Sequence, residues 1–183
     1  IEYATIFSAL DVKVTVIEPG DALLPFIDRE LVDEFIHEMR DRGMSLRFQS
    51  KVKRVTKPAP DACLIELEDS RQIWSEMVLF AAGRKGATES LELESCGLST
   101  DERGKVEVDR ATFRTKLPHI FAVGDVIGFP SLGSTSMEQG RSAACNAFDA
   151  PAQAPPEFFP YGIYSVPEMS TIGMTEEQVR QKH

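Results

Sequence analysis

Residues 115–125 read Thr115-Lys-Leu-Pro-His-Ile-Phe-Ala-Val-Gly-Asp125, and the chain continues Val-Ile-Gly-Phe-Pro-Ser-Leu132. A short apolar run over 120–123 ends in Gly124 and Asp125. Ligands of open α/β sheets bind at the carboxyl ends of such strands. Glycine lets a ligand approach the backbone closely, and a carboxylate accepts hydrogen bonds from sugar-type hydroxyls. The stretch predicts either a ligand-binding carboxylate at Asp125 or a plain strand followed by an Asp turn.

The N-terminal part of the chain alternates helical and strand patterns. We expect helix, strand, helix and strand over 2–10, 12–17, 29–42 and 45–49. The first helix carries apolar residues on one face: Tyr3, Ile6, Phe7 and Leu10. Asp28 is a good N-cap for the second helix, and Gly43 ends it. This order implies a parallel sheet with crossover helices.

The second expected strand ends in an acidic residue, Glu18. In a dinucleotide-binding βαβ unit, an acidic residue about 20 positions after the start of a G-x-G-x-x-G motif holds the adenosine ribose. Here that motif would lie just before Ile1. Glu18 is thus either a ribose ligand or a polar strand end, and as a ligand it favours NAD(H) over NADP(H), because a carboxylate repels a 2′-phosphate. Glu2 lies just past the expected phosphate site, where it could also simply offset the helix dipole.

Residues 51–82 have the pattern of an antiparallel meander, with strands expected over 51–56, 63–67 and 73–80. The run from Met77 is expected to return to the parallel sheet and to end in Gly83 and Arg84. Gly83 would allow close approach of a bound dinucleotide. A solvated loop charge is the expected role of Arg84.

The remainder of the chain contains one long helical pattern. We expect a short helix over 88–97, a strand over 105–108, and a helix over 135–148 capped by Ser134 or Thr135. The free N–H groups at the start of the long helix form a positive dipole end. Two short strands are expected within 162–173. A further helix then begins at Thr175, which stands in capping-box spacing with Gln178.

Composition excludes several classes of protein. The net charge of −9 argues against a general nucleic-acid or anionic-membrane surface. The three cysteines, Cys63, Cys96 and Cys145, form no CxxC or CxxxxC pair, so neither a redox disulfide nor a zinc pattern is present. No metal site and no catalytic histidine is expected. No apolar stretch approaches the roughly 20 residues that span a bilayer. A cytoplasmic location fits these features, and because the chain begins Ile-Glu-Tyr, we expect it to start inside a larger protein.

Taken in order, these segments resemble the FAD-dependent pyridine nucleotide-disulfide oxidoreductase superfamily along nearly the whole chain. Within it, the likeness is greatest to the soluble (Si-specific) pyridine nucleotide transhydrogenases. The motifs that carry the resemblance lie in four places: 2–7 (Glu-Tyr-Ala-Thr-Ile-Phe), 83–88 (Gly-Arg-Lys-Gly-Ala-Thr), 122–132 with Glu-Gln-Gly-Arg at 138–141, and 162–168 (Gly-Ile-Tyr-Ser-Val-Pro-Glu).

The resemblance implies an α/β, Rossmann-like, three-layer FAD/NAD(P)-binding fold, with a parallel sheet, an antiparallel meander and the start of an α+β dimerisation domain. It implies 1–83 as an NAD(P)-binding domain without its first strand and glycine motif, 84–150 as a return to the FAD-binding domain, 151–157 as a linker, and 158–183 as the start of the dimerisation domain.

The resemblance also implies functional roles. FAD would pass hydride between NAD(H) and NADP(H), and the full-length protein would be a homodimer. Glu2 would lie near the nicotinamide, Glu18 at the ribose and Gly83 along the NAD. In the FAD site, Asp125 after Gly124 would hold the flavin ribitol, while Leu132 and Gly133 would meet the flavin ring.

Two other hypotheses for the function remain open. One is a disulfide reductase of the dihydrolipoamide dehydrogenase type, and the other is a non-catalytic nucleotide-binding or assembly module. A CxxxxC pair upstream would favour the reductase. Because the expected FAD segment and first NAD strand lie outside the chain, we expect these 183 residues alone to bind neither cofactor tightly and to transfer no hydride.

Overall fold

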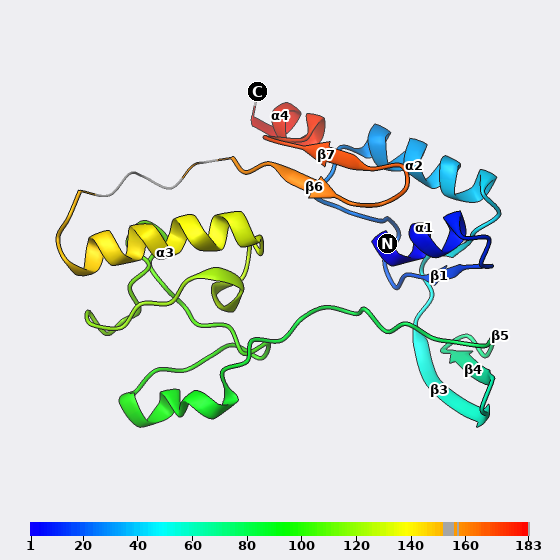
Figure 1. The fold of residues 1–183 in the computed structure, drawn as a ribbon, viewed down its shortest axis with the longest axis horizontal. Coiled ribbons are helices and arrows are strands. Elements are labelled where there is room, and N and C mark those ends of the chain that lie inside the picture. The colour runs from blue at the N-terminus through cyan, green and yellow to red at the C-terminus, as the bar shows by residue number, and fades with distance from the viewer. Residues whose placement is uncertain (152–155, 157, 183) are drawn as a thin grey trace. The chain divides into compact units, whose positions relative to one another are not determined.

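The computed structural model describes residues 1–151, 156 and 158–182, and these form two compact units (Figure 1). Unit 1 comprises Ile1–Phe80 together with the chain from Pro160 onward, and unit 2 comprises Ala81–Phe159. Most of the predicted linker over 151–157 lies outside the described residues. No described helix is long and apolar enough to cross a membrane.

Unit 1 begins with the predicted order of elements: α1 (Glu2–Ala9), β1 (Thr15–Ile17), α2 (Arg29–Asp41) and β2 (Ser45–Arg47). β1 and β2 pair in parallel, with Val16 opposite Leu46. The carboxylate of Asp28 accepts a hydrogen bond from the backbone N–H of Glu30 and caps α2 as predicted. A parallel pair joined by a helix is the arrangement that the sequence order implied.

The core of unit 1 is built around α2. The buried members of this core are Leu23, Ile27, Val32, Phe35, Met39, Met44 and Ile163. α1 contributes little to it, because Tyr3 and Leu10 on its apolar face are 63% and 69% exposed. α1 packs instead through Thr5, which is fully buried. The apolar face predicted for this helix is therefore present but largely solvent-exposed.

The meander is confirmed as a three-stranded antiparallel sheet of β3 (Val52–Ala59), β4 (Ala62–Leu67) and β5 (Gln72–Ser75), with β4 in the centre. Along β4, buried and half-buried residues alternate, so that Cys63, Ile65 and Leu67 point to one face. The alternation is the period of two that a half-buried strand requires.

The segment after β5 differs from the prediction. Residues 77–83 form no strand, and Met77 and Phe80 are 78% and 81% exposed. An apolar run becomes a strand only when another strand offers it backbone hydrogen bonds. No described strand lies in pairing position beside this run, so the expected return to the parallel sheet is not seen.

The C-terminal segment folds onto unit 1. β6 (Tyr161–Ile163) and β7 (Met169–Thr171) form an antiparallel pair, and α4 (Glu176–Lys182) follows. Ile163 is buried in the core around α2, and Figure 1 shows this pair beside α2. Thr175 and Gln178 exchange the two hydrogen bonds of a capping box, N to Oε1 at 3.1 Å and N to Oγ1 at 3.3 Å. The predicted strand pair and helix cap are confirmed.

Unit 2 contains α3 (Gly133–Ala147) and three short 3₁₀ turns, η1 (Glu89–Leu91), η2 (Leu93–Cys96) and η3 (Gly124–Ile127). Its buried apolar centre consists of Phe113, Ile127 and Ala143. The strands predicted over 105–108 and 120–123 do not form. Each segment contains one isolated β-bridge instead, Val106 with Thr100 and Phe121 with Arg114. As with residues 77–83, these apolar runs find no full strand partner among the described residues.

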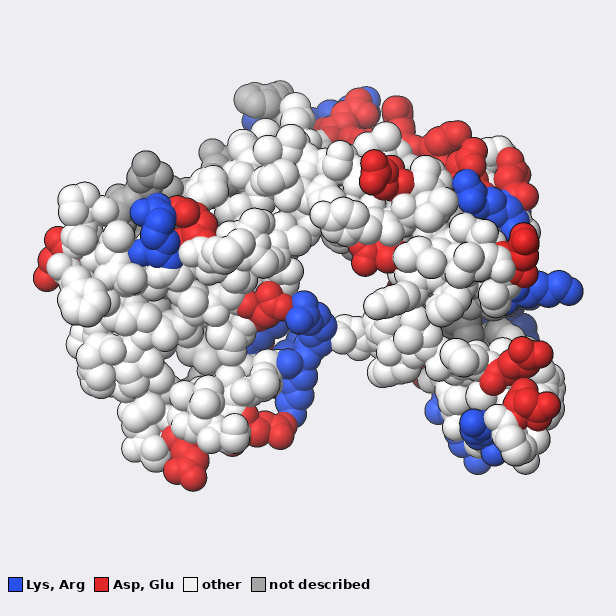
Figure 2. Space-filling model, viewed as in Figure 1, with Lys and Arg blue, Asp and Glu red and all other residues white. Residues whose placement is uncertain are grey.

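One surface of unit 1 is strongly acidic. Figure 2 shows red side chains gathered where α2 and α4 lie in Figure 1. The acidic residues of the two helices are Glu30, Asp33, Glu34, Glu38, Asp41, Glu176 and Glu177. A surface of this charge repels polyanions.

Candidate cofactor-binding site

The Gly124–Asp125 step stands at the start of η3, directly after the apolar run. Val123 is extended, with φ −143° and ψ 164°, and Gly124 then adopts φ +77°. A side chain at Gly124 would be strained in this left-handed conformation. Its Cβ would also lie 3.1 Å from the hydroxyl oxygen of Ser136. The glycine therefore allows the chain to turn sharply against α3 and to present Asp125.

The peptide N–H of Gly124 is held from α3. It donates a buried hydrogen bond to Oε1 of Gln139, with an N···O distance of 2.7 Å. Gln139 is 6% exposed. Gln139 lies within the Glu-Gln-Gly-Arg motif at 138–141, but the motif assigned this side chain no contact, because a glutamine next to Gly140 in a small-residue helix suits close packing equally well. Its role becomes visible only when η3 is placed against α3.

Asp125 forms an ion pair that the sequence did not predict. Its Oδ2 lies 2.6 Å from a guanidinium nitrogen of Arg84, and the two side chains are 41% and 77% exposed. Arg84 remains 77% exposed, as expected of a solvated loop charge, and it also has a carboxylate partner 41 positions later in the chain. Gly83, at φ +83°, directly precedes this arginine. The ion pair brings the predicted Gly83 segment to the predicted Asp125 turn.

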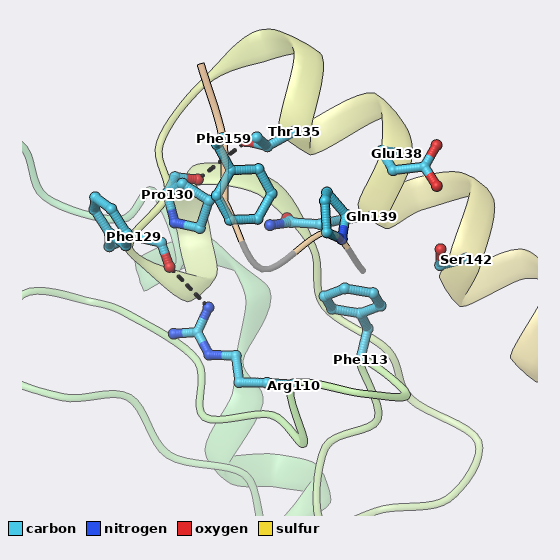
Figure 3. Close-up of a pocket in the computed structure, with 10 residues that line it drawn as sticks. Arg110, Phe113, Phe129, Pro130, Thr135, Glu138, Gln139, Ser142 and Phe159 are labelled. Atoms are coloured by element: carbon cyan, nitrogen blue, oxygen red, sulfur yellow. Dashed lines mark hydrogen bonds between the residues drawn. The ribbon is translucent and has the colours of Figure 1, made fainter. Parts of the chain in front are cut away.

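The loop after η3 is fixed by Arg110. Its guanidinium donates to the carbonyl oxygens of Ile127 at 2.7 Å and Phe129 at 3.0 Å, and the second bond is drawn in Figure 3. The preceding Asp109 accepts from the backbone N–H and the hydroxyl of Thr112. These bonds lower the pKa of Asp109. The sequence offered no signal for the two hydrogen bonds of Arg110, because an arginine in a loop ordinarily faces water.

Leu132 is the N-cap residue of α3, and no side chain caps this helix end. The hydroxyl of Thr135 instead donates backward to the carbonyl oxygen of Leu132 at 2.9 Å, so the predicted cap by Ser134 or Thr135 is wrong. A hydroxyl pointing back along the helix cannot accept from the first-turn N–H groups. Gly133, the first helical residue, has no heavy atom within 4 Å of its Cβ position. This helix end thus presents a bare backbone and a positive dipole end.

A cavity of about 230 Å³ lies on one side of α3 (Figure 3). Its lining is mostly apolar, with four polar or charged side chains beside Thr135: Arg110, Glu138, Gln139 and Ser142. The predicted cofactor residues Gly124, Asp125, Leu132 and Gly133 do not line it. Two cavity residues also bond to these cofactor residues: Gln139 through its acceptor oxygen to Gly124, and Thr135 through its hydroxyl to Leu132.

The two acidic residues predicted at the dinucleotide lie in unit 1. Glu18 follows β1, and its Oε1 accepts from the backbone N–H of Gly20 at 2.7 Å. Glu2 begins α1, and its Oε1 accepts from the backbone N–H of Tyr164 at 2.8 Å. Both side chains are half-buried. The structure thus places Glu2 and Glu18 at element ends in unit 1, and Gly83, Gly124, Asp125, Leu132 and Gly133 in unit 2.

Known proteins similar to this chain are found both by sequence and by structure. Residues 1–142 match the family model described as pyridine nucleotide-disulphide oxidoreductase. The chain is 45% identical over 179 residues to a soluble pyridine nucleotide transhydrogenase of Mycobacterium tuberculosis, covering 98% of this chain and 38% of that protein. A protein of the same description from Enterobacter is 41% identical, with 97% and 38% covered. The chain therefore spans less than two fifths of the curated relatives it matches.

Solved structures show the same likeness. LpdA of Mycobacterium tuberculosis superposes with a TM-score of 0.91 at 25% identity, covering 99% of this chain and 39% of that one. The HOCl-induced flavoprotein disulfide reductase of Escherichia coli superposes with a TM-score of 0.87 at 29% identity, covering 98% and 41%. Both support the α/β, Rossmann-like fold that the sequence predicts.

Proposed function

Because this chain belongs to the pyridine nucleotide-disulphide oxidoreductase family, we propose that it forms part of a FAD-dependent enzyme that transfers hydride between NAD(H) and NADP(H). The observation that carries the proposal is the Gly124–Asp125 turn. The N–H of Gly124 donates to Gln139 of α3, and the carboxylate of Asp125 pairs with Arg84, the residue after Gly83. The 45% identity to a soluble pyridine nucleotide transhydrogenase favours this reaction within the family.

The residues of unit 2 suit the ribitol and ring of a flavin. The carboxylate of Asp125 is 41% exposed, so a hydroxyl can reach it without unfolding the turn. The uncapped N–H groups at Leu132 and Gly133 suit an electron-rich ring edge, because a helix N-terminus favours negative charge. Bound FAD would supply the hydride acceptor, while these groups bind it and stabilise the charge that it gains.

The residues of unit 1 suit a nicotinamide dinucleotide. The Oε2 atom of Glu18 has no hydrogen-bond partner within the described part of the chain, so it is free for a ribose hydroxyl. Its charge favours NAD(H), since a 2′-phosphate would be repelled. Glu2 is similar: Oε1 accepts from Tyr164, and Oε2 is left for a donor such as the nicotinamide carboxamide.

The organisation of the longer protein belongs to the same proposal. We assign 1–83 to an NAD(P)-binding domain, 84–150 to the FAD-binding domain and 158–183 to the start of a dimerisation domain, with a homodimer acting in the cytoplasm. The packing of Ile163 into the core of unit 1 supports an interface domain that is anchored on the NAD(P)-binding domain.

A second candidate is a disulfide reductase of the dihydrolipoamide dehydrogenase type. The superposition on a flavoprotein disulfide reductase favours it, with a TM-score of 0.87. The two reactions differ in the final acceptor, which is a nicotinamide in one and a disulfide in the other. A redox CxxxxC pair in the longer protein is the feature that would distinguish them.

A chimera tests the proposal. This chain replaces the 179 aligned positions of the mycobacterial relative, and the purified protein is assayed for bound flavin and for hydride transfer from NADPH to a chromophoric NAD⁺ analogue. We expect both, and we expect no reduction of a dithiol-type disulfide substrate. In the same background, Asp125→Ala is expected to lose flavin, whereas Asp61→Ala in the exposed turn between β3 and β4 of unit 1 keeps it. Bound flavin with disulfide reduction and no transhydrogenation would favour the second candidate.

A further inference from the structure

Gln139 occupies an unusual position for a polar side chain. It lies inside α3 and is 6% exposed, beside the apolar cluster of Phe113, Ile127 and Ala143. Burying an amide is unfavourable unless its polar atoms are hydrogen-bonded. Its Oε1 obtains a short bond of 2.7 Å from the backbone N–H of Gly124, which lies 15 positions earlier in the chain. The bond therefore joins α3 to η3 through one side chain.

The N–H of Gly124 needs an acceptor from outside its own turn. The first N–H groups of any helical turn have no partner within that turn. Gly124 opens η3 and is itself buried, so water does not satisfy its N–H. Gln139 supplies the missing acceptor. It acts as a cap for η3 although it belongs to a different helix.

This bond controls the orientation of the neighbouring carboxylate. Gly124 is a glycine at φ +77°, so its peptide can rotate more freely than that of any other residue type. Asp125 is the next residue, and its carboxylate direction depends on that peptide. The ion pair with Arg84 is mostly exposed and contributes little rigidity. The buried bond to Gln139 is the stronger restraint on the turn.

We infer that Gln139 is a positioning residue that fixes the Gly124 peptide and thereby aims the Asp125 carboxylate at the flavin ribitol. The inference rests on the proposed function, because it assigns Asp125 to the flavin. Gln139 itself touches no cofactor. It acts through the backbone of η3.

Three variants of the chimera separate this role from a general packing role. Gln139→Leu keeps the size of the side chain and removes the acceptor. Gln139→Glu restores an acceptor oxygen at the same reach. Asn146→Leu is the matched control, because Asn146 also extends an amide from α3 to a loop backbone, donating to the carbonyl oxygen of Thr112 at 3.2 Å, far along the helix from η3. Each variant is measured for its FAD dissociation constant and for its melting temperature.

We expect Gln139→Leu to raise the FAD dissociation constant by about tenfold, the loss that follows from one unsatisfied hydrogen-bond donor. Gln139→Glu should recover it to within about threefold of the parent. Asn146→Leu should lower the melting temperature without changing FAD affinity. In the 183-residue chain, hydrogen exchange at the Gly124 amide should be faster in Gln139→Leu and unchanged in Asn146→Leu.

Two results would overturn the inference alone: a parent chimera that binds FAD while Gln139→Leu binds it equally well, or equal losses of affinity in Gln139→Leu and Asn146→Leu. A parent chimera without bound flavin would overturn the proposed function and this inference together. The Gly124 exchange measurement would still show whether the Gln139 bond exists, so the two failures are distinguishable.

Discussion

Replacing Gly86 with alanine should destabilise unit 2, because two backbone segments meet there without space for a methyl group. A Cβ atom on Gly86 would lie 2.1 Å from the carbonyl oxygen of Gly104. Real Cβ atoms essentially never approach another heavy atom within 3.0 Å, so this contact must widen by 0.9 Å, from 2.1 to 3.0 Å. The obstacle is a backbone atom, so no side-chain rotation can relieve it.

The free energy lost can be worked from the same contacts. The Gly86 N–H donates to the carbonyl oxygen of Arg103 at 2.7 Å, and the Thr88 hydroxyl donates to that of Gly104 at 2.9 Å. Forcing a methyl group into a closed contact costs about 1–3 kcal/mol. Leaving one partner of such a bond unsatisfied costs about 1–3 kcal/mol. The same small displacement would relieve the close contact and weaken the hydrogen bond, so the two costs overlap and do not add in full. We therefore expect the free energy of unfolding to fall by about 2–4 kcal/mol.

Urea unfolding followed by hydrogen exchange at the amides of Gly86 and Val106 measures this loss in unit 2. Tryptophan fluorescence would not, because Trp74 belongs to unit 1. Gly140→Ala is the control: no heavy atom lies within 4 Å of its Cβ position in α3. Alanine there should raise stability by about 1 kcal/mol. A Gly86→Ala protein within about 0.5 kcal/mol of the parent would refute the reasoning.

Three further predictions concern single side chains. Thr5→Val keeps the shape of a fully buried residue but removes the oxygen that accepts from the N–H of Val166 at 3.0 Å, so unfolding of unit 1 should become easier by about 1–3 kcal/mol in urea titrations. Asp28→Ala removes the α2 cap and the acceptor for the N–H of Glu176; circular dichroism melts should show a loss of about 1 kcal/mol or more, and an unchanged melt would contradict the cap. The lowered pKa of Asp109 means that its charged form stabilises the fold above its ordinary pKa of about 3.9, and that this contribution is lost as the pH falls further. Asp109→Asn should therefore show a melting temperature that falls less on acidification from about pH 6 to 3 than that of the parent.

Local signals in the sequence were sufficient to predict several elements. Asp28 was recognisable as a helix cap, because its short acceptor side chain precedes an amphipathic run. Thr175 and Gln178 were recognisable as a capping box from their spacing alone. The parallel pairing of β1 and β2 followed from the helix between them. Each of these features depends on residues close together in the chain.

The predicted strands that failed depended on partners far away in the chain. The apolar runs over 77–83 and 120–123 look like strands, but a strand exists only when another strand completes its hydrogen bonds. The predicted cap of α3 failed for a different, local reason: the Thr135 hydroxyl bonds to the carbonyl oxygen of Leu132, three positions earlier, and a cap pattern does not show which of the two bonds a hydroxyl makes.

The sequence by itself determined the order of helices and strands from α1 to β5, the acid that follows β1, and the Gly124–Asp125 turn as one of the motifs shared with the family. Only the tertiary structure decided what holds that turn in place. Gln139 bonds to a residue 15 positions away, and Arg84 pairs with a residue 41 positions away. Neither pairing produces a periodic pattern in the sequence. A hydrogen bond depends on where two atoms meet in space, whereas a sequence pattern records only which face of an element each residue occupies.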